Sequence, residues 1–155
     1  MTTSAADELE AKRQRLQSRI PSGIEDASTK GVNHIAVFAK DLEATAEFYS
    51  EIMGMPVIGV TANRDVTDST HMNVDIGSGT SLAFFDFPNV PRLRRRAPEG
   101  VGNVMHIALP ISQERFEQVK VRLDKNRVKY QVIGGSLYLK DPNGLGLELM
   151  PARRS

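Results

Sequence analysis

The chain has 155 residues, of which 25% are charged and 40% hydrophobic, and its formal net charge at pH 7 is +1. This length fits one domain, or one domain made of two small similar halves. A net charge so close to zero gives no general attraction to nucleic acid, and no apolar run approaches the ~18 residues that a membrane span needs. Without cysteine, any metal must bind to histidine, carboxylate and water.

Residues 1–30 are predicted to form an N-terminal extension that is mainly helical. The segment from Ala5 to Ile20 has the pattern of a charged helix, and Pro21 and Gly23 break it. Two interpretations stay open, a solvated or packing arm and an arm that clasps a second copy of the chain. Because this end lacks the apolar core of a signal peptide, we expect a cytoplasmic location.

A first module is predicted over residues 31–88. We expect a strand at 33–38, a helix at 41–53, and further strands at 55–61, 71–76 and 82–87. Asp41 is a suitable N-cap for the helix, and Gly54 is a suitable residue to end it. Gly77 and Gly79 flank the turn between the last two strands.

After a linker at 89–101, rich in proline and arginine, the same order of elements returns over residues 102–151. We expect a strand at 105–109, a helix capped by Ser112, and strands at 128–133, 136–139 and 145–150. The first strands also match locally, as His34-Ile35-Ala36-Val37 and His106-Ile107-Ala108-Leu109. Such a repeat predicts an α+β fold of two βαβββ modules, which form a cupped mixed sheet with the helices outside.

Alternation along three of these strands separates large aliphatic residues from single polar ones. His34, His106 and Glu148 each share a face with small residues, whereas their aliphatic neighbours lie on the opposite face. Two imidazoles and one carboxylate form the facial triad associated with non-haem Fe(II), although Mn(II), Ni(II), Zn(II) and Co(II) also accept such ligands. We therefore predict an open site for a divalent metal, with Fe(II) favoured.

These residues resemble the vicinal oxygen chelate superfamily, which includes glyoxalase I, methylmalonyl-CoA epimerase, extradiol dioxygenases and antibiotic-resistance proteins. The resemblance covers Gly31 to Pro151 and implies paired βαβββ modules with His34, His106 and Glu148 as metal ligands. Its most specific stretch runs from Leu137 to Glu148 and is similar to the C-terminal half of the extradiol dioxygenase signature, with Tyr138, an Asp-Pro-Asn-Gly turn and the ligand glutamate in that order.

The chain also departs from this superfamily at two places. The dioxygenase signature has a histidine several residues before the tyrosine, where this chain has Lys129, Tyr130 and Gln131. Glyoxalases and epimerases usually add a fourth ligand from the fourth strand, where Asp86 is the only candidate. The first departure disfavours ordinary catechol cleavage, and the second favours a three-ligand site.

Two further side chains are candidate catalytic residues. Tyr138 is placed to hydrogen-bond a substrate oxygen or to act as an acid, unless it only packs. His71 is a candidate substrate contact or base, unless its strand face is simply solvated. Because Phe84, Phe85 and Phe87 include both faces of their strand, we expect at least one of them to line an apolar substrate pocket. The basic cluster Arg92 to Arg96 is either an anion-binding group or part of a solvated linker.

The sequence therefore predicts a metal-dependent enzyme that acts on a small substrate through one or two vicinal oxygens. Ring cleavage of the extradiol dioxygenase type leads, followed by a glyoxalase- or epimerase-like lyase or isomerase. A thiol transferase and a non-catalytic resistance protein that sequesters a small molecule are the remaining alternatives. The expected partners are the substrate and a second copy in a homodimer, with neither nucleic acid nor membrane.

Overall fold

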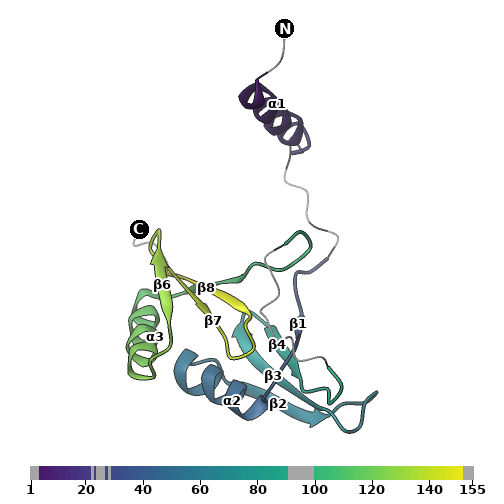
Figure 1. Ribbon diagram of the computed structural model, residues 1–155, viewed down its shortest axis with the longest axis vertical. Helices are drawn as coiled ribbons and strands as arrows, with labels where there is room; N and C mark the ends of the chain where they lie inside the picture. The colour runs from purple at the N-terminus through teal and green to yellow at the C-terminus, as the bar shows by residue number, and fades with distance from the viewer. Residues whose placement is uncertain (1–3, 22, 24–26, 28, 91–99, 152–155) are drawn as a thin grey trace. The chain divides into compact units, whose positions relative to one another are not determined.

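The structure is a computed structural model that describes residues 4–21, 23, 27, 29–90 and 100–151 (Figure 1). The chain divides into two units, Met1–Gly31 and Val32–Ser155. The first unit contains the helix α1 (Ala5–Gln17), which begins with a capping box between Ser4 and Asp7 and buries none of its residues. Within the described ranges, no helix combines the length and the apolar character that crossing a membrane requires.

The second unit consists of two βαβββ modules, which confirms the predicted α+β class. The first module contains β1 (His34–Phe38), α2 (Leu42–Glu47), η1 (Phe48–Met53), β2 (Val57–Ala62), β3 (Thr70–Gly77) and β4 (Thr80–Phe85). The second contains β5 (Ile107–Ile111), α3 (Gln113–Lys125), β6 (Tyr130–Ile133), β7 (Ser136–Lys140) and β8 (Gly146–Pro151). Their sheets have the equivalent orders β1-β4-β3-β2 and β5-β8-β7-β6, and remain two separate sheets within the chain.

The helix predicted at 41–53 begins and ends as expected but changes character midway. The Asp41 side chain accepts a hydrogen bond from the backbone N–H of Ala44, and Gly54 ends the segment in the left-handed region with a φ of 70°. From Phe48 onward the turns widen into the π-helix η1. Phe48, Tyr49 and Met53 are buried there, so the wider turn serves packing against the core.

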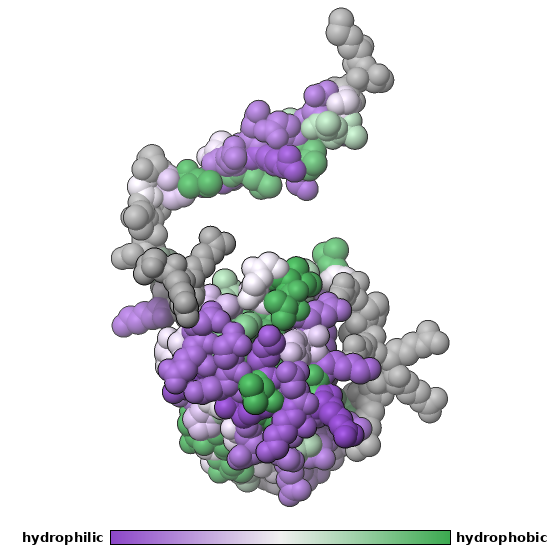
Figure 2. All heavy atoms as spheres, turned by 90° about the vertical axis from the view of Figure 1, so that its left-hand side faces the viewer, coloured by the Kyte–Doolittle hydropathy of each residue, from purple (hydrophilic) through white to green (hydrophobic). Residues whose placement is uncertain are grey.

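Both sheets place their aliphatic faces on one shared hydrophobic core. The first sheet contributes Val74, Leu82 and Phe84, the second contributes Leu137, Leu139, Leu147 and Leu149, and the helices contribute residues such as Tyr49, Phe116, Val119 and Leu123. The outer side of the unit, where α3 lies, is mainly hydrophilic with separate hydrophobic patches (Figure 2). Because the two sheets share a core, their opposite faces are directed away from it, and these faces hold the predicted site residues.

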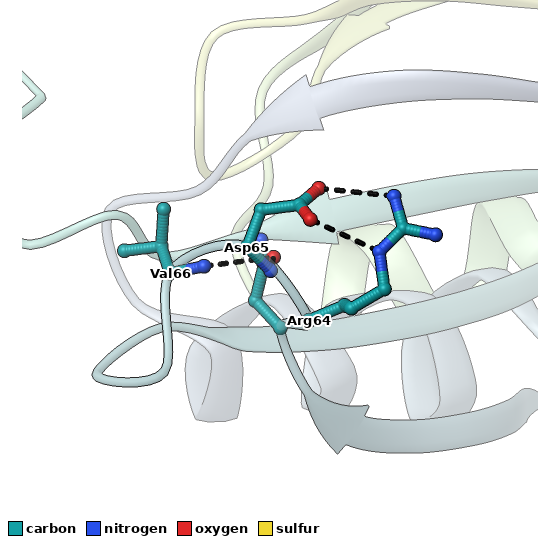
Figure 3. A network of polar contacts seen from close by, with 4 residues as sticks. Arg64, Asp65 and Val66 are labelled. Atoms are coloured by element: carbon teal, nitrogen blue, oxygen red, sulfur yellow. Dashed lines mark hydrogen bonds and ion pairs between the residues drawn. The ribbon is translucent and has the colours of Figure 1, made fainter.

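The connection between β2 and β3 is stabilised locally (Figure 3). The side-chain oxygen of Asn63 accepts hydrogen bonds from the backbone N–H groups of Asp65 and Val66, at 2.9 and 3.3 Å, which is the geometry that asparagine favours in turns. Arg64 makes a two-point ion pair with Asp65. Both side chains are exposed, so the pair contributes little to stability.

A buried polar network joins the two modules at the Asp141-Pro142-Asn143-Gly144 turn. The Asp141 carboxylate accepts hydrogen bonds from the hydroxyl of Tyr49 and from the backbone N–H groups of Asn143 and Leu145. The Asn143 side chain donates to the Thr45 hydroxyl and accepts from the backbone N–H of Lys40. Burial raises the pKa of Asp141, and these hydrogen bonds oppose that shift.

We expect Asp141→Ala to lower the free energy of unfolding by about 3 kcal/mol, because several buried donors lose a charged acceptor. Tyr49→Phe removes a single hydrogen bond and should cost about 1 kcal/mol. Urea denaturation at one fixed protein concentration measures both values. Asp68→Ala, at an exposed position of the β2–β3 connection, is the matched control and should change stability by less than about 0.5 kcal/mol. Equal effects at positions 68 and 141 would contradict the stabilising role of the network.

Candidate metal centre

The structure brings two of the three predicted ligands together on the second sheet. Nε2 of His106 lies 2.9 Å from Oε2 of Glu148, and their side chains are 32% and 12% exposed. Glu148 is on β8, and His106 immediately precedes β5, which pairs with β8 in parallel. The backbones approach so closely here that a Cβ added to Gly146 would lie 3.1 Å from Cα of His106 and would collide with the Met105 carbonyl oxygen.

Tyr138 is a third member of this group and fixes the orientation of the carboxylate. It lies directly opposite Glu148 in the antiparallel pairing of β7 with β8, and its hydroxyl donates a hydrogen bond of 2.7 Å to Oε1 of Glu148. The ring of Tyr138 also meets the His106 ring edge-on, with centroids 5.6 Å apart. One carboxylate oxygen is thus held by tyrosine, and the other faces the imidazole.

The hydrogen bonding keeps Glu148 ionised. Hydrogen bonds from Tyr138 and then from Ser136 are the main causes that lower the pKa of Glu148, with a further contribution from the His106 charge. The same contact with Glu148 raises the pKa of Tyr138, so the phenol stays protonated. Cation binding would use the ionised carboxylate together with the neutral form of the imidazole.

His106 Nε2 donates a hydrogen bond directly to Oε2 of Glu148, and the spacing of these two atoms is also compatible with a shared divalent metal. Two neighbouring ligands of an octahedral ion, each about 2.1 Å from the metal, lie about 3.0 Å apart. The observed distance between Nε2 of His106 and Oε2 of Glu148 is 2.9 Å. The residue on β5 next to Glu148 is Ala108, and its small side chain leaves space for further ligands.

His34 lies on the first sheet and does not join this pair within the chain. Among the described residues, no group of three histidine, aspartate or glutamate side chains is arranged to hold a metal ion. The face of β1 that holds His34 is directed away from the shared core, as is the face of β8 that holds Glu148. Nδ1 of His34 is 2.9 Å from the amide oxygen of Asn33. That oxygen is an acceptor, so Nδ1 donates and Nε2 keeps a free lone pair.

The repeat places an alanine, not an acid, at the fourth-ligand position. Glu148 pairs with Ala108 of β5, and the equivalent partner of Ala36 in the first module is Ala83. Asp86 follows β4, and its Oδ1 accepts a hydrogen bond of 2.6 Å from the backbone N–H of Thr70. Asp86 thus has a structural partner, and the strand register places Ala83, not Asp86, at the position equivalent to Glu148.

His71 lies on the same face of the first sheet as His34 but at its other end. His34 pairs with Ser81, whereas His71 pairs with Phe85, four residues further along β4. At about 3.3 Å per residue, this offset is about 13 Å along the strands. The His71 ring stacks on Phe85 at 4.4 Å, and its Nε2 is buried without a hydrogen-bond partner in the described part of the chain. A catalytic role for His71 stays a prediction.

Sequence reasoning missed the residues that orient the ligands. Asn33 precedes the first histidine directly, so adjacency alone was a usable signal for its contact with His34. The contact between Tyr138 and Glu148 depends on the pairing of β7 with β8, and a hairpin register counted from the Asp141–Gly144 turn would have found it. The predicted cluster Arg92 to Arg96 falls outside the described residues.

Comparison with known proteins agrees with this architecture. Residues 31–149 match the family model of the Glyoxalase/Bleomycin resistance protein/Dioxygenase superfamily. The chain belongs to this superfamily. Its fold is similar to that of the fosfomycin resistance protein FosX from Listeria monocytogenes in complex with Mn(II), with a TM-score of 0.61, 21% sequence identity, and coverage of 80% of this chain and 94% of that one.

Two curated relatives differ in how much of their length the chain spans. The metallothiol transferase FosB of Staphylococcus epidermidis is 29% identical over 129 residues, which are 77% of this chain and 82% of FosB. The putative ring-cleaving dioxygenase MhqE of Bacillus subtilis is 32% identical over 62 residues, which are 38% of this chain and 20% of MhqE. Members of this superfamily thus include metal-dependent proteins that act on small molecules, in two chemical classes.

Proposed function

We propose that the chain is a metal-dependent enzyme whose metal centre forms between two copies of the chain. His106 and Glu148 of one copy and His34 of the other would be the three protein ligands. The observation that supports this most directly is the distance of 2.9 Å between Nε2 of His106 and Oε2 of Glu148. The second copy is needed because the shared core directs the two ligand-bearing faces of one chain apart.

The unpaired strands suggest how the copies join. β1 and β5 are edge strands of their sheets, and each begins at or directly after a ligand histidine. Pairing of β1 from one copy with β5 from the other would place the two histidines on strands about 4.8 Å apart. Ile133, on the face of the second sheet that holds Glu148, is 58% exposed in one chain, and a homodimer would cover it.

Three protein ligands would leave about three positions on an octahedral cation for the substrate. When bound, the cation supplies Lewis acidity and a template for two vicinal oxygens, and iron also supplies reactivity with dioxygen. Tyr138 then has a defined task, because its hydroxyl is within one hydrogen bond of Glu148 and is able to donate to a substrate oxygen instead. Fe(II) is our favoured metal, and Mn(II), which FosX binds, is next.

Ring cleavage of a vicinal diol is the reaction that we propose first. The three-ligand set and the stretch from Tyr138 to Glu148 support it, as do relatives named as ring-cleaving dioxygenases. Ala83 at the fourth-ligand position disfavours a glyoxalase- or epimerase-like reaction. Thiol addition is the second candidate, because the chain spans 82% of FosB but only 20% of MhqE. A cytoplasmic location stays a prediction from the sequence.

A mixing experiment tests whether two chains share each site. His34→Ala and Glu148→Ala should each abolish metal binding as pure proteins, because each removes a ligand from every site. After the two variants are unfolded together and refolded, half of the dimers contain one copy of each. Each mixed dimer has one intact site, so metal analysis should recover about a quarter of the wild-type content.

Two results would contradict shared sites. No recovery in the mixture would mean that all three ligands come from one chain, and full metal content in either pure variant would remove that residue from the ligand set. A mixture of Glu148→Ala with His106→Ala is the matched control. These two ligands belong to the same half-site, so their mixed dimers contain no intact site and should bind no metal.

Tyr138→Phe tests the reaction separately from metal binding. We expect the metal content to stay near that of the wild type, because tyrosine is not a ligand, and kcat to fall about 10²- to 10⁴-fold, the range for loss of a proton-transfer group. Oxygen uptake by iron-loaded protein over a panel of vicinal diols is the measurement. Iron-loaded protein that consumes no oxygen with any diol, whereas manganese-loaded protein adds a thiol to an epoxide, would replace ring cleavage with the second candidate.

A further inference from the structure

An aromatic cluster lies on the same face of the first sheet as His34, at the opposite end. Phe38, Phe85 and His71 are aligned across β1, β4 and β3 by the strand register. His71 stacks on Phe85 with an interplanar angle of 13°. Phe87 also stacks on Phe85, with the two ring centroids 5.7 Å apart. Phe38 meets Phe87 edge-on at 5.6 Å. We define these four residues as the aromatic end of the face.

The aromatic end is not part of the hydrophobic core. Phe84 of β4 is fully buried in the core, whereas Phe85 and Phe38 are not members of it. Phe38 is 61% exposed, although a phenyl ring is among the most favourable groups to bury. Phe84 and Phe85 are consecutive at the end of β4 and lie on opposite faces of the sheet, so Phe84 packs in the core and Phe85 lies on the face with His34.

Between His34 and the aromatic end, the face is lined by small side chains. Ala36 of β1 pairs with Ala83 of β4. Ala83 also pairs with Asn73 of β3, and Asn73 pairs with Gly59 of β2. The strand register separates the metal end from the aromatic end by about 13 Å along the strands. A single six-membered ring chelated at the metal would not reach the aromatic end, whereas a molecule of two or three fused rings would.

We infer that the substrate is an extended planar aromatic molecule, with its vicinal oxygens at the metal and its far ring against Phe38 and His71. This inference rests on the proposed function, because the chelating end is the proposed metal centre. It gives His71 the role of a substrate contact: its ring is already stacked flat on Phe85, and its buried Nε2 has no hydrogen-bond partner in the described part of the chain. Simple catechols would be poor ligands, because they leave the aromatic end unfilled.

The test compares the binding of two probes to the iron-loaded protein without oxygen, by calorimetry. We expect 2,3-dihydroxynaphthalene to bind about tenfold more tightly than catechol, the value of one well-stacked additional ring. Phe38→Ala should reduce this ratio at least about threefold, with unchanged iron content. Val121→Ala, an exposed apolar residue of α3, is the matched control and should keep the wild-type ratio. An unchanged ratio in Phe38→Ala would overturn the inference.

A second set of variants separates ring contact from other roles. His71→Phe should keep the ratio of the two affinities, because a phenyl ring also stacks. If Phe38→Ala does not fold, Phe38→Leu replaces it. A lower ratio in His71→Phe would overturn the assignment of His71 as a stacking contact. If Phe38→Ala instead converts dimers to monomers in sedimentation while the ratio stays constant, the second copy occupies this face and the inference fails.

Metal-free protein distinguishes the failure of this inference from the failure of the proposed function. The aromatic end alone should bind 2-naphthol weakly, and Phe38→Ala should abolish that binding, whatever the metal content. Binding of 2-naphthol by a protein that takes up no metal would overturn only the metal centre. Tight chelation of both diols with equal affinity, and no binding of 2-naphthol, would overturn only the aromatic end.

Discussion

The hydrophobic core that both sheets share determines which faces of the sheets are buried and which are left for the candidate site. Val74 and Leu82 of the first sheet and Leu137 and Leu149 of the second lie in one cluster with the helices, and the Asp141 network joins the modules at a second place. Burial of these faces against each other is the main source of stability. Its geometric consequence is that the faces with His34 and Glu148 are directed away from the core, which is why the proposed metal centre needs a second copy of the chain.

Much of this arrangement was predictable from the sequence, because alternation and turn chemistry are local. The aliphatic residues beside His34 and Glu148 identified the buried face of each strand, and Asp41 and Gly54 identified a helix start and end. The change to a π-helix at Phe48 was not predictable, since it serves core contacts distant in the sequence. The pairing of Ala36 with Ala83 likewise depends on strand register, so the question of Asp86 as a ligand needed the structure.

Contacts among the candidate site residues fix their orientations, as Tyr138, Glu148 and His106 show. Each side chain limits the freedom of the next: the phenol holds one carboxylate oxygen, and the imidazole faces the other. A carboxylate oriented before a cation arrives loses less conformational freedom on binding it. On the first sheet, Asn33 has a comparable effect on His34 by selecting the tautomer. In the proposed metal centre, each module would therefore orient its own ligands before the copies meet.

Gly146 shows that a position can constrain the site without touching any ligand group. Any side chain there would meet the backbone at Met105 and His106, so β8 and β5 would have to separate beside the imidazole. In a library of random substitutions, we expect position 146 to tolerate little variation. The cause would be steric, because a hydrogen atom is the largest group that fits between these two strands.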